Sequence, residues 1–187
     1  MSWAIWLTGP PGSGRSTLAR LSAARMAALG APVTVLELDR LRIVLTPQAT
    51  YREAERDLVY RALAYMAATL VEAGAPVIVD ATAHRRAWRA AARAAIPRFA
   101  EVQLVCPLNV CRERERSRPQ GSAPAAVYAR AGQPGATVPG VDVPYEPALA
   151  ADLTIDTTVD GVAAAAARVV ALAERLAASG ARTSRAS

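Results

Sequence analysis

The sequence predicts an α/β fold of three layers, in which a parallel sheet of about five strands is covered by helices on both faces. Short apolar runs recur along the chain and alternate with stretches of helical periodicity, an order typical of parallel strands joined through helices. A Gly-rich turn separates the first apolar run from the first helical stretch. The 187 residues, 52% of them hydrophobic, suffice for one domain with a substantial core.

The elements can be placed in chain order from these patterns. The apolar runs that predict strands contain β-branched residues and span 4–7, 33–38, 76–79, 102–106 and 153–155. Helical periodicity predicts helices over 15–29, 52–73, 85–95, about 108–117, and 160–178. Gly30, Gly74 and Gly180 stand where glycines that end helices are expected.

One stretch near the C-terminus shows no periodicity. Between Pro119 and Pro147, Gly, Pro and small residues dominate, and so long a segment is usually either a functional lid or disordered. An Arg-rich helix and a strand bracket it, which favours a lid over about 115–147. We therefore expect a single domain over 1–180 that includes this lid, and a loose tail over 181–187.

Composition restricts the class of ligand. The net charge is +6 and all 22 basic residues are Arg, which suits anionic ligands such as nucleotides. These arginines are dispersed along helices without interleaved aromatic residues, so nucleic-acid binding is disfavoured. Cys106 and Cys111 are expected to be reduced thiols. No secretory signal and no apolar run near the roughly 20 residues that span a bilayer are visible, so we expect a cytoplasmic protein without a membrane segment.

The Gly-rich turn over residues 9–17 is a phosphate-binding loop of the G-x-x-x-x-G-K-[ST] type, and it indicates a P-loop NTPase-type fold. In such a loop, backbone N–H groups surround the phosphates of ATP and the first hydroxyl after the basic residue ligates Mg²⁺. The predicted nucleotide-binding residues are Gly9, Gly12, Ser13, Gly14, Arg15, Ser16 and Thr17, with Ser16 as the metal ligand. Arg15 replaces the usual Lys and keeps its charge but not its geometry, so nucleotide binding is favoured over full catalytic power. The alternative is a Gly/Pro-rich turn without a ligand.

Acidic residues follow two predicted strands, at the edge where open parallel sheets bind ligands. Asp39 follows the second strand and Asp80 the third. Either carboxylate could hold a metal-bound water or accept the proton of an acceptor hydroxyl. The alternative for each is an N-cap of the following helix. His84, the only histidine, could touch substrate or could be a surface residue without a role.

Two groups of arginines could bind anions. Arginines at 112, 114, 116 and 118 alternate with glutamates, which is typical of a solvated helix face but could also close over a triphosphate. Arg52, Arg56 and Arg61 could hold an anionic acceptor, and Tyr51 could stack on a base. Exposed arginines paired with neighbouring glutamates are the equally supported alternative.

Taken together, these stretches resemble the adenylylsulfate kinase family, which transfers phosphate from ATP to the 3′-hydroxyl of adenosine 5′-phosphosulfate. The resemblance covers Trp6 to Thr157 and includes residues 37–42 (Glu-Leu-Asp-Arg-Leu-Arg), similar to Asp-Gly-Asp-Asn-x-Arg. It also includes residues 108–114 and the paired segments 140–147 and 153–157. It implies ATP and Mg²⁺ as cofactors and a small nucleotide-like acceptor. The resemblance implies catalytic Asp39 and Arg15, with Arg114, Asp156 and Thr157 on the donor side and Arg42, Tyr51, Arg56, Arg61 and Val138 at the acceptor.

Several positions depart from the family pattern. Arg15 replaces the loop Lys, Val59 replaces an Asn, and Val138 stands where the family has a second aromatic ring against the acceptor adenine. Residues 125–128 (Ala-Ala-Val-Tyr) stand where the family has Lys-Gly-Leu-Tyr in the lid. Residues 77–82 (Val-Ile-Val-Asp-Ala-Thr) resemble the third strand of the polynucleotide-kinase and zeta-toxin-like kinases. Adenylylsulfate is therefore the best single prediction for the acceptor, and another hydroxylated metabolite is the alternative. The hypothesis from a different class is a degenerate nucleotide-binding protein without catalytic activity. A homodimer is an open alternative for the assembly.

Overall fold

The computed structural model describes residues 2–117 and 127–181 and contains one parallel sheet of five strands. The strands are β1 (Ala4–Thr8), β2 (Thr34–Glu37), β3 (Val77–Asp80), β4 (Phe99–Val105) and β5 (Leu153–Asp156). They lie in the order β2-β3-β1-β4-β5, with β1 at the centre. The predicted fold class is confirmed.

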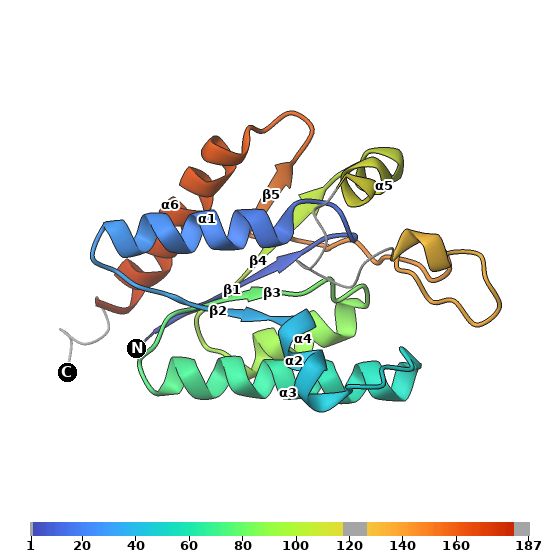
Figure 1. Ribbon diagram of the computed structural model, residues 1–187. Helices are drawn as coiled ribbons and strands as arrows, with labels where there is room; N and C mark the ends of the chain where they lie inside the picture. Colours follow the sequence, from blue (N-terminus) through green and yellow to red (C-terminus); the bar gives the residue numbers. More distant parts are fainter. Residues whose placement is uncertain (1, 118–126, 182–187) are drawn as a thin grey trace.

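Helices cover both faces of the sheet, which makes the three layers visible in Figure 1. They are α1 (Arg15–Ala28), α2 (Leu38–Leu45), α3 (Glu53–Glu72), α4 (Arg86–Ala95), α5 (Leu108–Arg116) and α6 (Val162–Ala181), and a short 3-10 helix spans Tyr128–Arg130. Helices α1 and α6 lie on one face, and α3 and α4 on the other (Figure 1). Among the described residues, none of these helices combines the length and apolarity needed to cross a membrane.

The central strand joins the two cores. Ala4 and Trp6 pack with residues of α3 and α4, whereas Ile5 and Leu7 pack with residues of α1 and α6. This alternation follows from the period of two along a strand, and all four side chains are buried. A strand covered on both faces has to be apolar throughout, which is why the sequence shows a continuous apolar run there.

The structure corrects three element boundaries. Strand β2 ends at Glu37 and helix α2 begins at Leu38, so Asp39 lies in the first turn of a helix that the sequence analysis did not expect. Strand β4 begins at Phe99, three residues before its predicted start, and includes the charged Glu101, which interrupts the apolar run and is paired with Arg89 of α4. Helix α6 continues to Ala181, so Gly180 lies inside the helix rather than after it.

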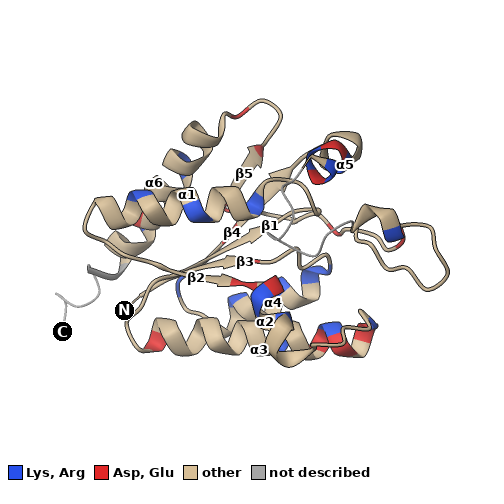
Figure 2. Ribbon diagram, in the orientation of Figure 1, with Lys and Arg blue, Asp and Glu red and all other residues tan. Residues whose placement is uncertain are grey.

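The carboxyl ends of the strands meet at the edge that also carries α2, α5 and the segment 127–147 (Figure 1). Charged residues of α3 gather toward its N-terminal end, on this same side (Figure 2). Residues 118–126 of the predicted lid, and the tail from 182, lie outside the described residues. The described part, 127–147, forms turns beside the phosphate loop rather than a separate layer.

Candidate active site

A pocket of about 350 Å³ opens at the carboxyl edge of the sheet. The phosphate loop, α2, the start of α3 and the segment 127–139 line it. It brings together eight of the predicted site residues: Gly12, Arg15, Ser16, Asp39, Arg42, Tyr51, Arg56 and Val138. The exposed residues Thr17 and Arg61 do not line it, and neither do Asp80 and His84, which lie deeper.

The phosphate loop packs tightly against α5. Gly12 has a φ of 77°, and a Cβ at this position would overlap the carbonyl oxygen of Cys111. Glycine is therefore required at this position by both backbone conformation and space. The hydroxyl of Ser13 is buried in the loop and has no hydrogen-bond partner among the described atoms. A buried polar atom of this kind is unfavourable until a ligand or a rearrangement satisfies it.

Arg15, the first residue of α1, pairs with Asp80 at the end of β3. Its Nη1 lies 3.3 Å from Oδ1 of Asp80, and the two side chains are 13% and 7% exposed. The guanidinium still forms part of the pocket wall. The residue that replaces the loop Lys is therefore held by a carboxylate from a neighbouring strand.

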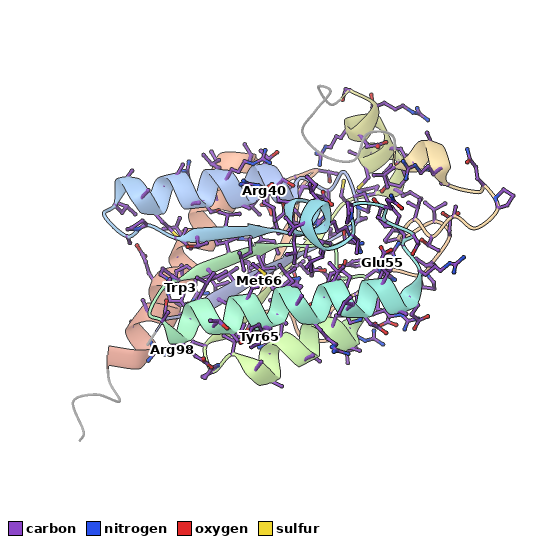
Figure 3. The ribbon with its side chains drawn as sticks, turned by 60° about the horizontal axis from the view of Figure 1, so that its bottom comes forward. Trp3, Arg40, Glu55, Tyr65, Met66 and Arg98 are labelled. Atoms are coloured by element: carbon purple, nitrogen blue, oxygen red, sulfur yellow. The ribbon has the colours of Figure 1, made fainter. Side chains whose placement is uncertain are left out.

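Tyr51 lines the pocket in a strained backbone conformation. Its φ is 56°, which is uncommon for a residue with a bulky side chain. Its N–H donates to Glu55 at 3.1 Å, and its carbonyl accepts from Nε of Arg56 at 2.8 Å. Arg42 lies 5.0 Å from the centre of the Tyr51 ring and itself donates to Glu55 at 3.0 Å. Figure 3 shows Glu55 toward the pocket end of α3.

The charge of Glu55 supports this arrangement. Burial raises the pKa of this carboxyl, but hydrogen bonds from Thr50 and Tyr51 and the charge of Arg42 outweigh it and lower the pKa. The carboxylate therefore stays ionised while it orders the turn before α3.

Arg56 links α3 to the segment that follows the 3-10 helix. Its Nη2 donates to the carbonyl and the hydroxyl of Thr137, at 2.7 and 3.0 Å. Val138, the next residue, is buried and lines the pocket. The pocket wall around Val138 is thus held in place by the same arginine that binds the carbonyl of Tyr51.

His84 lies behind this arginine. It is 4% exposed, its Nδ1 is 3.4 Å from Nη1 of Arg56, and its ring meets that of Trp88 edge to face. Burial first, and then the charge of Arg56, lowers its pKa from 6.5 to about 4. A neutral imidazole can accept the hydrogen bond from Arg56, which indicates a supporting position rather than the substrate contact that the sequence suggested.

The predicted donor residues form a separate cluster at the end of β5. Arg114 donates to the hydroxyl and the carbonyl of Thr157 at 2.9 and 2.7 Å. Hydrogen bonds from the side chain and backbone of Thr158 lower the pKa of Asp156. The hydrogen bonds of Arg114 fix the loop after β5 to helix α5, and none of the three predicted donor residues lines the pocket.

Sequence reasoning missed several pocket residues. Tyr60 of α3, Glu115 of α5 and Arg130 of the 3-10 helix line the pocket without having been assigned a site role, and so does Thr82 after β3. The hydroxyl of Tyr60 accepts the N–H of Ala83, another residue at positive φ. A tyrosine inside an apolar helical pattern gives no sequence signal of such a role, whereas the place of Thr82 two residues after the end of β3 is such a signal.

The sequence and the fold are similar to those of known proteins of one family. A family model described as adenylylsulphate kinase matches residues 1–156. The chain belongs to the adenylylsulfate kinase family. A probable adenylyl-sulfate kinase of Archaeoglobus fulgidus is 36% identical over 160 residues, which cover 84% of this chain and 97% of the relative. An adenylyl-sulfate kinase of a Synechococcus strain is 34% identical, with 76% and 77% of the two chains covered.

A solved member of the adenylylsulfate kinase family has the same architecture. The Mycobacterium tuberculosis APS kinase CysC, determined in complex with AMPPNP and APS, is similar with a TM-score of 0.80 and 30% sequence identity. The similarity covers 92% of this chain and 98% of that one.

The residues of the pocket suit a nucleotide with Mg²⁺. Magnesium in phosphoryl-transfer sites is usually held by one or two protein oxygens together with phosphate oxygens. The hydroxyl of Ser16 and the carboxylate of Asp39 supply such oxygens on the wall of one pocket. The Asp80 carboxylate, which the sequence analysis also proposed as a ligand, is occupied by Arg15.

The packing at Gly12 predicts a difference between two loop glycines. Gly12→Ala and Gly14→Ala both place a side chain at positive φ, but a Cβ at Gly14 meets nothing within 4 Å. We expect Gly12→Ala to reduce the free energy of unfolding by on the order of 1–3 kcal/mol more than Gly14→Ala, because it overpacks the contact with α5. Urea unfolding of both variants measures this. Equal losses would show that the close approach to Cys111 is unimportant.

The burial of His84 predicts a pH dependence of stability. Between pH 6.5 and about 4 the unfolded chain binds a proton at this imidazole that the folded chain does not. The contribution of neutral His84 to the free energy of unfolding is therefore present above pH 6.5 and is lost as the pH falls toward 4. We expect the free energy of unfolding to fall by about 2 kcal/mol more between pH 7 and pH 5 in the natural protein than in the His84→Asn variant. Urea unfolding at both pH values tests this. NMR titration of the only imidazole in the chain checks its pKa directly, and a midpoint near 6.5 in the folded protein would contradict the expectation.

Proposed function

We propose that this protein is an ATP-dependent adenylylsulfate kinase that transfers the γ-phosphate to the 3′-hydroxyl of adenosine 5′-phosphosulfate. Membership of the family and similarity to an APS kinase bound to a nucleotide analogue and APS support the proposal. The observation that carries it is that Arg15 and Ser16 of the phosphate loop line the same pocket as Asp39, Arg42 and Arg56. Such a pocket can hold a donor and an acceptor end to end.

The donor phosphates would be bound by the loop N–H groups at the start of α1, where the helix dipole favours negative charge. Arg15 would add a positive charge beside the transferring phosphoryl group. When bound, Mg²⁺ supplies further neutralisation of the phosphates, and Ser16 and Asp39 are the residues that would hold it. Arg114 and Thr157 would support the donor base beyond the loop.

The acceptor would lie against the wall formed by α2 and α3. Arg42 and Arg56 carry positive charge to an anionic phosphosulfate, and Asp39 can accept the proton of the hydroxyl as the phosphoryl group arrives. Tyr51 and Val138 would bracket the adenine. The exposed guanidinium of Arg130 stands at the lid side of the same pocket.

A second acceptor class has a specific observation in its favour. Val138 supplies an aliphatic surface, and both Arg42 and Arg56 lie within 6 Å of the Tyr51 ring centre, at 5.0 and 5.7 Å. A base would therefore stack against fewer aromatic surfaces than a pair of rings provides. An anionic hydroxylated metabolite without a base is the alternative acceptor for the same phosphoryl transfer.

The proposal is tested by following ATP consumption and the phosphorylated product with adenylylsulfate as acceptor. We expect turnover with adenylylsulfate, and weak acceptor binding that Val138→Phe strengthens by about 5- to 150-fold, the value of one stacking partner. A panel of nucleosides, nucleotides and sugar-like metabolites is the control. Robust phosphorylation of another compound and none of adenylylsulfate would retire the assignment but leave a kinase, whereas no consumption of ATP with any acceptor would favour a degenerate nucleotide-binding protein.

The role of Asp39 predicts a separable defect. Asp39→Asn keeps the size of the side chain and removes its charge, so turnover should fall by roughly 100-fold or more while ATP still binds. Steady-state kinetics and calorimetric titration with ATP and Mg²⁺ measure the two effects. Asp57→Asn on α3 is a matched control, since that carboxylate binds the Trp88 indole instead. Near-normal turnover of Asp39→Asn would exclude it as the proton acceptor.

A further inference from the structure

The ion pair between Arg15 and Asp80 joins the phosphate loop to the next strand of the sheet. Asp80 ends β3, β3 lies beside β1, and the loop that follows β1 leads directly to Arg15. The side chains meet at 3.3 Å and are almost completely buried. A charge pair so poorly solvated is sensitive to the loss of either partner.

The remaining atoms of the guanidinium show that Asp80 does not saturate it. Nε of Arg15 is buried without a hydrogen-bond partner among the described atoms, while the side chain still lines the pocket beside Gly12 and Ser16. Arginine carries five N–H donors in a rigid planar fork. One edge can therefore bind a carboxylate while another donor is directed at a phosphate oxygen.

Lysine at this position would behave differently. Its ammonium is a single compact charge, and the Asp80 carboxylate would attract it away from the phosphates. A carboxylate at the end of β3 is therefore compatible with an arginine in the loop, whereas it would draw a lysine away from the phosphates. An unpaired arginine would also be bulkier and less well fixed than the lysine it replaces.

We propose that Asp80 is a positioning residue that fixes the guanidinium of Arg15 so that its remaining donors bind the phosphates of the nucleotide. The inference rests on the proposed kinase function of this pocket. In this role Asp80 neither binds the metal nor accepts the proton of the acceptor hydroxyl, which are the two roles suggested by its position at a strand end. Its effect on the reaction passes through Arg15.

The inference predicts that the effect of one substitution depends on the other residue. Arg15→Lys alone should lower kcat by about 10-fold or more, because Asp80 captures the ammonium. Asp80→Asn alone should lower kcat by a similar factor, because the guanidinium loses its anchor. The double variant should recover to within about 3-fold of the natural protein, because the lysine is then free to reach the phosphates. Kinetics with saturating acceptor, KM for ATP and calorimetric affinity for ATP with Mg²⁺ measure the cycle.

Two further variants control for misfolding. Asp80→Glu keeps the charge but displaces it by one methylene group, so it should lower kcat while the melting temperature stays near that of the natural protein. Arg20→Lys changes another arginine of α1 whose partner, Glu37, lies at 3.1 Å on an exposed surface, and it should change neither kcat nor nucleotide affinity. Each variant is also compared by circular dichroism.

The cycle overturns the inference if the kinetic losses of Arg15→Lys and Asp80→Asn multiply in the double variant. Lower melting temperatures with unchanged kcat and KM would also overturn the inference, since an ion pair that only stabilises the fold gives that result. If adenylylsulfate is not phosphorylated at all, the proposed function fails, but the calorimetric cycle for ATP with Mg²⁺ still reports the coupling. Equal nucleotide affinity in all four proteins would then overturn the role of Asp80 independently of the acceptor.

Discussion

The buried guanidinium of Arg89 organises the edge of the sheet that carries the pocket. It is 1% exposed and donates to Glu101 of β4 and to the carbonyls of Ala83 and Glu146. These three partners belong to a strand, to the turn after β3 and to the end of the segment 127–147. A charge left unpaired in the interior is costly. Arg89 therefore fixes the position of β4, of the turn that carries Ala83 and His84, and of the end of the segment 127–147 relative to one another.

The pocket itself contains strain that its neighbours hold in place. Tyr51 and Ala83 are the described non-glycine residues at positive φ, and each is fixed by hydrogen bonds at both its N–H and its carbonyl. Such conformations persist only where the surroundings over-determine them. Here the partners are side chains of α3 and α4, so the helices on one face of the sheet set the backbone conformation on this side of the pocket.

The sequence was sufficient for the sheet, the phosphate loop and most helices because those features depend on local patterns. Helix α2 was missed because Leu38 continued the apolar run of β2, and its helical partner Arg42 is a buried charge that periodicity analysis treats as polar. The start of β4 was missed for the same reason at Glu101. The pairing of Arg15 with Asp80 joins residues far apart in the chain, and only the order of strands brings them into contact.

The central place of β1 has a consequence for how the protein is made. Ala4 pairs with Val77 on one side and with Phe99 on the other. Because β1 precedes both neighbours in the chain, it remains without β3 until Val77 and without β4 until Phe99 has been synthesised. During that interval its apolar residues are exposed, and such late, non-local pairing slows folding and favours aggregation. The apolar residues of β1 are consequently the part of the sheet most exposed to aggregation before β3 and β4 are in place.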